Sequence, residues 1–396
     1  MPGQIPLWLD CDPGHDDVFA ILLAAHHPGI KLLGISTVHG NASLDNTTNN
    51  ALSILAAIGK HRDVKVYPGA SRALQRVPIH ATAIHGESGL DGTELLPKPQ
   101  STADTSTRAV DAMAAALKAT EPGTAWVVAT GAVTNVGTLF IEHPDLAAHV
   151  RGVSIMGGSI GGGFTSAVMG KVDDVERIGN YTPWAEFNIL IDPEAAASIF
   201  DNPVLAAKTT LIPLDLTHLV LATPEVQDML LYGPRGGDHA AGDAAGKEKK
   251  KKEGKTRLRT MLVELLNFFA ATYRDVFGIT AGPPLHDPLA VAAVLTGTEH
   301  EIPFYDYDPA AGPEQQQQQR ERFAVKVVTE GTLAEALEGA QTGRTVATPL
   351  PPGSEGVRIP RGLDIAAFWR VVEECCERAD EANAKAEAEA ESGGEA

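Results

Sequence analysis

The chain has 396 residues, 43% of them hydrophobic, and a formal net charge of −19 at pH 7. Its length suits one large α/β domain with insertions or two domains, and its acidity disfavours nonspecific binding to nucleic acid or to anionic membranes. The sequence contains no apolar run of membrane-spanning length and no leader typical of a signal peptide. Its three cysteines are too few for a disulfide framework. These features favour a soluble cytoplasmic enzyme without a nucleic-acid or membrane partner.

Short apolar, β-branched segments alternate with helical patterns along the first half of the chain. Strands are predicted at residues 7–9, 32–38, 64–67, 125–129, 153–156 and 209–214. Helices are predicted from residue 16 onwards and at 47–58, 105–119, 135–141 and 193–200. This alternation predicts an α/β fold with an open, mostly parallel sheet flanked by helices, a Rossmann-like core.

The second half of the chain predicts fewer strands and three segments that look added. Helices are expected at 257–277, 287–295 and 364–379, and strands at 323–328 and 345–348. Residues 233–255 are rich in Gly, Ala and Lys, residues 310–319 end in five glutamines, and residues 380–396 form an acidic, alanine-rich tail. The lysine run is typical of an import or partner-binding patch or, as we favour, of a solvated loop. We predict one domain over 1–379 with flexible insertions and a disordered tail.

Four carboxylates, Asp10, Asp12, Asp16 and Asp17, lie within eight residues at the end of the first predicted strand. Acids this close repel one another unless a cation neutralises them, and hard divalent cations prefer oxygen ligands. One or two acids could simply cap the following helix, but four are more than capping needs. The pattern therefore predicts a divalent metal site at the carboxyl end of a strand, where open α/β sheets bind ligands.

Further polar segments follow other predicted strands. They are His39-Gly40-Asn41, residues 85–92, residues 130–135, residues 179–188 and His286-Asp287-Pro288. Each alone is also explained by turns, caps or surface polarity. Because loops at one rim of a parallel sheet converge, their common placement predicts a single pocket.

Together these segments resemble the inosine-uridine preferring nucleoside hydrolases, calcium-dependent N-ribohydrolases that release a free base from a nucleoside. The shared motifs, in the order of the family, are DCDPGHDD, HGN, HGESGLDG, VTN, GNYTPWAEFNILIDPEAA and HDPLA. The resemblance covers roughly residues 5–375 outside the insertions. It implies a nucleoside hydrolase-like fold, Ca²⁺ as cofactor, a small nucleoside as substrate, and a homodimer or homotetramer.

The resemblance also assigns roles by motif position. The implied Ca²⁺ ligands are the carboxylates of Asp12, Asp17 and Asp287 and the backbone carbonyl of Thr134. Asp10 is expected to support them by hydrogen bonding. The ribose-binding residues by position are Asp16, Asn41, Asn180, Glu186 and Asn188, and Met156 matches a residue that lines the ribose pocket. His85 and His286 match positions that face the base.

The chemistry of the reaction agrees with these residue types. Cleavage of an N-glycosidic bond builds positive charge on the sugar, which a ring of carboxylate and amide oxygens stabilises. We predict that Asp12 is the general base for the attacking water, that His286 is the general acid for the leaving base, and that His85 is its helper or substitute.

Four further residues have two interpretations each. His15 lies where relatives often have an apolar residue, and both it and Trp184 are expected to pack. Tyr273 and Phe277 could stack on the base or belong to the core.

The two histidines near the leaving group fit either a pyrimidine-preferring enzyme or a broad enzyme for inosine and uridine, and we expect uridine to be among the substrates. A phosphatase that uses a DxD motif is disfavoured, because the PGHDD and AEFN stretches do not belong to that class. A noncatalytic nucleoside-binding or sensor protein on the same fold is the remaining alternative.

Overall fold

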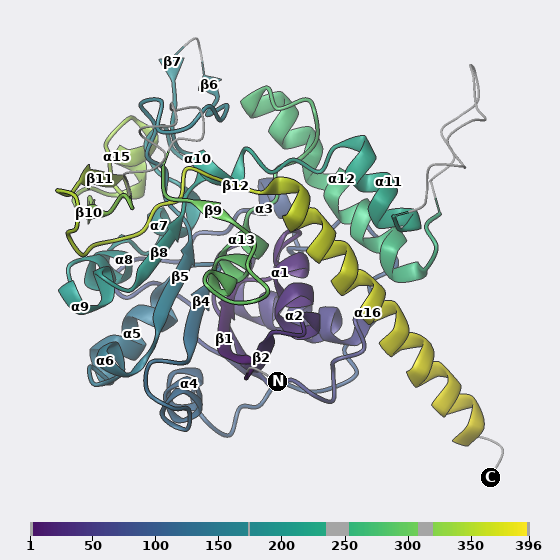
Figure 1. The fold of residues 1–396 in the computed structure, drawn as a ribbon. Coiled ribbons are helices and arrows are strands. Elements are labelled where there is room, and N and C mark those ends of the chain that lie inside the picture. The colour runs from purple at the N-terminus through teal and green to yellow at the C-terminus, as the bar shows by residue number, and fades with distance from the viewer. Residues whose placement is uncertain (1–2, 173–174, 235–252, 308–319, 394–396) are drawn as a thin grey trace, which may run out of the picture.

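A six-stranded parallel sheet forms the centre of the computed structural model, which describes residues 3–172, 175–234, 253–307 and 320–393 (Figure 1). The strands lie in the order β3-β2-β1-β4-β5-β8, and every pairing is parallel. They are β1 Ile5–Cys11, β2 Ile30–Thr37, β3 Val66–Pro68, β4 Trp126–Ala129, β5 Gly152–Met156 and β8 Thr209–Ile212. The predicted α/β fold is confirmed.

The order of the strands reverses between β1 and β4. The chain builds β1, β2 and β3 outward in one direction and then returns to add β4, β5 and β8 on the other side of β1. In open α/β sheets the crevice outside the carboxyl ends at such a reversal binds ligands. The acidic motif begins in β1 itself, so the topology puts it at this crevice.

Helices cover both faces of the sheet (Figure 1). One face packs against α1 Asp17–His26, α2 Leu44–Ala57, α13 Asp287–Ala292 and α16 Ile365–Gly393. The other packs against α4 Ala109–Lys118, α5 Thr134–Glu142 and α8 Pro193–Phe200. Side chains of β1 alternate between the two cores, as a pleated strand requires: Leu7, Leu9 and Cys11 join the first, and Trp8 joins the second.

The remaining elements lie around this three-layer core. The strands predicted near 323–328 and 345–348 form a separate antiparallel pair, β10 Phe323–Val327 with β11 Thr345–Pro349. Two smaller pairs are β9 Phe304–Tyr305 with β12 Gly362–Leu363, and β6 Lys171–Val172 with β7 Val175–Glu176. The further helices are α3 Thr82–His85, α6 Leu146–His149, α7 Phe187–Ile191, α9 Pro203–Ala206, α10 Leu214–Thr217, α11 Pro224–Tyr232, α12 Arg257–Phe277, α15 Leu333–Leu337 and a 3₁₀ turn, Ala293–Leu295.

Local signals explain the bounds of α12, which coincide with the prediction. The Thr256 side chain accepts a hydrogen bond from the Arg259 backbone amide at 3.2 Å and so caps the first turn. Gly278 ends the helix with φ of 69°, the left-handed conformation that glycine adopts without strain. No described helix is long and apolar enough to cross a membrane.

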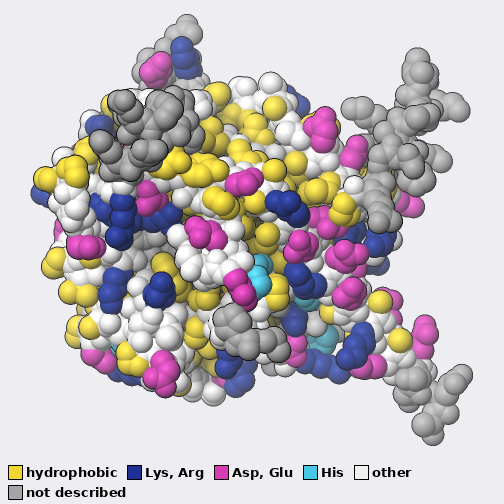
Figure 2. Space-filling model, in the orientation of Figure 1, with side chains coloured by type: hydrophobic (Ala, Val, Ile, Leu, Met, Phe, Trp, Pro, Cys, Tyr) yellow, Lys and Arg dark blue, Asp and Glu magenta, His cyan; other side chains and the backbone are white. Residues whose placement is uncertain are grey.

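The predicted boundary of the disordered tail at residue 380 is wrong, because α16 continues to Gly393. The Asp380 carboxylate accepts hydrogen bonds from Arg259 Nε at 2.6 Å and from the Thr256 hydroxyl at 2.7 Å. Arg259 is fully buried and also pairs with Glu373 at 2.9 Å. These contacts hold α16 against α12. Figure 2 shows many acidic side chains on this part of the surface, along α16. Most of the predicted insertion 233–255, and all of 310–319, lie outside the described residues.

Replacement of Asp380 tests this anchor of α16. In Asp380→Asn the buried Arg259 guanidinium loses one of its two anionic partners, so we expect the free energy of unfolding to fall by about 1–3 kcal/mol. The neighbouring Glu381 is exposed and makes no contact with Arg259, so Glu381→Gln is the matched control and should change it by less than about 0.5 kcal/mol. Urea unfolding measures both, and equal effects would contradict the anchor.

Candidate active site

Three carboxylates meet at the predicted edge of the sheet. Asp16 is the N-cap of α1, Asp17 is its first residue, and Asp287 is the first residue of α13. One oxygen from each lies within 4.8 Å of the others, and all three residues are buried. The two helix starts, far apart in the sequence, thus bring their acids together beside the end of β1.

Asp12 lies beside this group in a socket made by backbone. A Cβ atom on Gly40 would overlap Asp12 Oδ2, and one on Gly131 would lie 2.5 Å from Oδ1. Asn41 donates from its backbone amide to Asp12 Oδ2 at 2.8 Å, and its side-chain amide lies 3.3 Å from both Asp12 Oδ1 and Asp17 Oδ2. The HGN and TGAVTN motifs therefore supply close-fitting glycines and a bridging asparagine.

No positive side chain balances these acids in the described part of the chain. None of the ion pairs there involves Asp12, Asp16, Asp17 or Asp287. Burial, and then repulsion from Asp16, raises the pKa of Asp17 to about 7. Burial followed by repulsion from neighbouring acids also raises the pKa values of Asp12 and Asp287 well above their usual range. A buried, all-oxygen donor set without a counter-charge fits a hard divalent cation.

Asp10 faces away from this group, towards neighbouring elements. Its Oδ1 accepts hydrogen bonds from the Ser36 hydroxyl and from Asn135 Nδ2, the latter at 2.8 Å, and its Oδ2 is buried without a partner. Burial raises the pKa of Asp10 to about 7. Asp10 thus ties β1 to β2 and α5 just behind the acids.

The motif position of Thr134 implies a metal ligand, but its hydroxyl and its carbonyl form hydrogen bonds with residues outside this group of acids. Its hydroxyl donates to Asp192 at 2.6 Å, and its carbonyl accepts from the Thr138 hydroxyl at 2.8 Å. The residue of this loop that reaches the acids is Thr130, whose hydroxyl donates to Asp17 Oδ1 at 2.8 Å. Thr130 was not singled out, although it directly follows β4. The metal-ligand role of Thr134 stays a prediction.

A cavity opens beside the acids. Of the residues predicted from the sequence, it is lined by Asp16, Asn41, His85, Met156, Asn180, Glu186, Asn188, Tyr273, His286 and Asp287. Thr130 and Phe187, which also line it, lie in segments predicted to converge there but had no assigned role, and Ala81, Ile84 and Phe269 had no signal in the sequence. The structure therefore brings together side chains from segments that lie between residues 16 and 287 of the sequence.

The AEFN stretch holds its polar groups in place through the start of α7. Glu186 is the N-cap, and its carboxylate accepts from the backbone amides of Asn188 and Gly158, both at 2.8 Å. Asn188 Nδ2 donates to the Thr130 carbonyl at 3.1 Å. Asn180 Oδ1 accepts from the Phe187 amide at 2.8 Å. Burial raises the pKa of Glu186 to about 7. The site thus presents fixed oxygen and amide groups to a bound molecule.

His286 is held between two hydroxyl groups. Its Nδ1 lies 2.7 Å from Thr217 Oγ1, and its Nε2 lies 2.6 Å from the Tyr273 hydroxyl. The Asn180 side-chain amide also donates to the Tyr273 oxygen. Burial, and then neighbouring histidines, lower the pKa of His286 well below its usual value. Tyr273 packs among aromatic rings of α12, as one interpretation expected, and also reaches the cavity, whereas Phe277 packs beside it in the core.

His85 is joined to His15 on another side of the cavity. The two Nδ1 atoms are 2.9 Å apart, and His15 Nε2 lies 2.7 Å from the Asp91 carbonyl oxygen. The His15 ring stacks on Phe268 at 4.9 Å between ring centroids. The packing role expected for His15 is therefore only part of its contacts. The Arg344 guanidinium carbon lies 4.5 Å above the centre of the Trp184 ring. Trp184 does not line the cavity.

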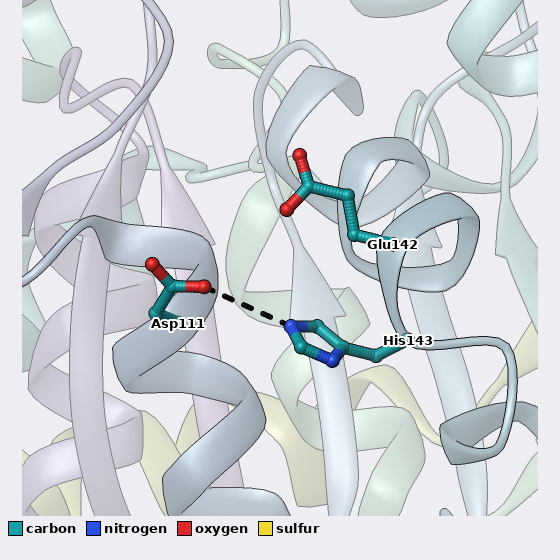
Figure 3. Close-up of side chains that lie close together, drawn as sticks. All are labelled: Asp111, Glu142 and His143. Carbon is teal, nitrogen blue, oxygen red and sulfur yellow. Dashed lines mark ion pairs between the residues drawn. The ribbon is translucent and has the colours of Figure 1, made fainter.

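A second acidic group lies away from the cavity, between α4 and the end of α5. It consists of Asp111, Glu142 and His143, which are partly exposed (Figure 3). The Arg108 guanidinium pairs with Asp111 at 2.8 Å and with Glu142 at 2.6 Å. Because the Arg108 guanidinium already pairs with both carboxylates, this group is a weaker candidate for a cation site.

The sequence model of the family described as "Inosine-uridine preferring nucleoside hydrolase" matches residues 7–370. The chain belongs to this family. It is 37% identical over 382 residues to the uridine nucleosidase of Saccharomyces cerevisiae, covering 96% of this chain and 97% of that relative. It is also 37% identical over 294 residues to the pyrimidine-specific ribonucleoside hydrolase RihA of Salmonella arizonae, covering 74% of this chain and 79% of that relative.

Solved structures of nucleoside hydrolases have the same fold. The purine-preferring ribonucleoside hydrolase from Gardnerella vaginalis gives a TM-score of 0.70 at 24% identity, covering 94% of this chain and 99% of that one. At that identity the likeness shows the fold alone. The predicted family and enzyme class, an N-ribohydrolase, are thereby confirmed by the sequence comparisons.

The raised pKa values predict how metal binding depends on pH. In the metal-free fold the pKa of Asp17 is raised from 3.8 to about 7, so its protonated form is favoured. This carboxyl therefore contributes its full stability to the metal-free fold below pH 3.8, and the contribution is lost as the pH rises through about 7. Divalent cations bind the deprotonated form. We therefore expect Ca²⁺ to raise the melting temperature, relative to chelator-treated protein, by more at about pH 8 than at about pH 5. Thermal unfolding at both pH values measures this, and a shift independent of pH would contradict it.

Proposed function

We propose that this N-ribohydrolase cleaves uridine, and inosine as another substrate, to free base and ribose with Ca²⁺ as its cofactor. The observation that carries the proposal is the buried, uncompensated group of acids at one end of a cavity whose other walls present fixed amides and two neutral histidines. The similarity to a uridine nucleosidase and to a pyrimidine-specific hydrolase supports uridine.

The acids are the proposed cation site. Asp12, Asp17 and Asp287, with the Thr134 carbonyl, are the ligands that the motif positions imply, and the proximity of Asp16 to two of them lets one carboxylate contact the sugar beside the cation. When bound, Ca²⁺ would orient ribose hydroxyls and a water molecule and make that water more acidic. The Thr130 hydroxyl, which bonds Asp17, supports this group from the end of β4.

Asp12 is the proposed general base. Two glycines and the Asn41 amide fix its carboxylate, so its position needs little reorganisation when water binds. Water attacks the anomeric carbon directly while the bond to the base breaks. The carboxylates of Asp16 and Glu186 lie along the cavity and stabilise the positive charge that develops on the sugar.

The proton for the leaving base is proposed to come from the Tyr273 hydroxyl, which is bonded to His286. Thr217 lies 2.7 Å from His286 Nδ1 but 3.4 Å from the Leu214 carbonyl, which favours donation by the hydroxyl to Nδ1. His286 then carries its proton on Nε2 and donates a hydrogen bond to the Tyr273 oxygen. The Tyr273 hydroxyl is left to give its proton to the base, and the hydrogen bond from His286 stabilises the phenolate that remains. The proton that Asp12 takes from the attacking water returns through solvent to Tyr273 after the products leave. This refines the prediction for His286, which acts through Tyr273.

Ribose release provides the direct test. The purified protein, supplied with Ca²⁺, should release ribose from uridine, and a chelator should abolish the release. Asp12→Asn removes the proposed base and should lower kcat by about a hundredfold or more. Asp111→Asn, in the acidic group that Arg108 neutralises, is the matched control and should retain activity.

The same assay ranks inosine, cytidine and adenosine against uridine. Activity that resists both the chelator and Asp12→Asn would contradict the proposed mechanism. A folded, Ca²⁺-loaded protein that binds nucleosides but releases no ribose would instead indicate a nucleoside-binding or sensor protein.

The charge of the cavity predicts discrimination against nucleotides. Three carboxylates, Asp16, Glu186 and Asp287, line it, and among the described residues no lysine or arginine does. A 5′-phosphate would meet these anions without a cationic partner, and like-charge contacts cost several kcal/mol. We expect kcat/KM for uridine 5′-monophosphate to be at least about a hundredfold below that for uridine. Comparable rates on the two compounds would show that the acids do not face the 5′ end of the sugar.

A further inference from the structure

The contact between His15 and His85 connects a buried histidine to one that lines the cavity. His15 lies in the turn between the acids and is fully buried, whereas His85 ends α3 and lines the cavity. Gly14 permits the approach, because a Cβ there would lie 2.6 Å from His85 Nδ1. The two rings therefore meet at the base-binding side of the acid loop.

The hydrogen bonds of this pair fix the position of each ring proton. A carbonyl oxygen only accepts, so His15 must donate from Nε2 to Asp91 at 2.7 Å. A neutral imidazole carries one proton, which leaves His15 Nδ1 as an acceptor. His85 Nδ1, 2.9 Å away, must then donate. The second nitrogen of His85, Nε2, is left bare and has no hydrogen-bond partner among the described residues.

The opposite arrangement would require a charged His15. In that case His85 Nδ1 would be bare and would accept from the His15 backbone amide, which is 3.4 Å away. The His15 ring would then have to donate from both nitrogens, as a cation. Its ring is fully buried and stacks on Phe268, an environment that penalises charge. The Asp91 carboxylate, which bonds the Glu87 amide and the Ser88 hydroxyl, favours the cation, but burial outweighs it and lowers the pKa of His15 to about 4.

We propose that His15 is a positioning residue that fixes the tautomer of His85, so that His85 Nε2 accepts a hydrogen bond from an N–H group of the nucleobase. This inference rests on the proposed nucleoside hydrolysis and assigns His85 a role within it. Ring N–H groups such as N3–H of uracil and N1–H of hypoxanthine are suitable donors. His85 then orients the base as an acceptor, while proton donation comes from the Tyr273 side.

The test compares two variants on two substrates, with the full-length, Ca²⁺-loaded protein. His15→Leu and His15→Asn are similar in size, and both lose the stacking on Phe268 and the bond to Asp91. Only asparagine can present an acceptor oxygen to His85 Nδ1. The substrates are uridine and p-nitrophenyl β-D-ribofuranoside, whose leaving group has no N–H and needs no proton.

We expect kcat/KM for uridine to fall about ten- to a hundredfold in His15→Leu and about threefold or less in His15→Asn. The aryl riboside should change by less than about threefold in both variants, because its leaving group does not use His85. Adding His15→Leu to His85→Ala should cause no further loss on uridine, since the effect passes through His85. Equal losses on the two substrates, equal losses in the two variants, or no loss on uridine would overturn the proposal.

A spectroscopic readout separates this inference from the proposed function. In protein labelled with ¹⁵N-histidine, the shifts of His85, assigned by their loss in His85→Ala, should show a protonated Nδ1 and a bare Nε2. In His15→Leu the proton should move to Nε2 in a substantial fraction of molecules. If the wild-type protein cleaves neither riboside, the proposed function fails, and these shifts still test the pair. A protonated Nε2 in the wild type would overturn the inference.

Discussion

Negative charge buried at the carboxyl end of β1 is the constraint on which the site depends. Asp12 and Asp17 are inaccessible to solvent, and Asp16 and Asp287 are nearly so, and no lysine or arginine of the described part of the chain forms an ion pair with them. Such a group is stable as carboxylates only with a cation, so binding of the cation and formation of the site are coupled. The glycine socket around Asp12 and the bridging Asn41 hold these charges in place before a cation binds. The proposed Ca²⁺ therefore has a structural role as well as a chemical one.

Much of the fold was predictable because its signals are local. The order of apolar strands and amphipathic helices gave the parallel sheet, and α8 and α12 lie within their predicted bounds because caps and a terminal glycine mark them. The tail was mispredicted for the opposite reason. Its composition is typical of disorder, but Asp380 is bonded by Arg259, 121 residues earlier in the chain. Composition alone does not reveal a partner that only the folded chain brings near.

In the site, too, sequence patterns indicate some residues and miss others. Acids, amides and histidines that follow strands converge because parallel strands end at one edge, and most of the predicted residues line one cavity. The partners of those residues are set by distances across the folded chain. Thr130 on Asp17 and Thr217 on His286 had no distinguishing signal beyond a threonine near an element end. The dual contacts of Tyr273 and His15 likewise depend on tertiary packing.

The two predicted histidines that line the cavity, His85 and His286, illustrate why residue type alone does not fix a chemical role. Both are buried, and burial lowers the pKa of each well below its usual value, so neither brings a positive charge to the cavity. What each does then depends on its partners. A second imidazole bound to a carbonyl leaves His85 with a lone pair, whereas His286, between two hydroxyl groups, is placed to donate to Tyr273. In the proposed reaction, one end of the cavity stabilises positive charge on the sugar, and the other, without net charge, both accepts from the base and donates to it.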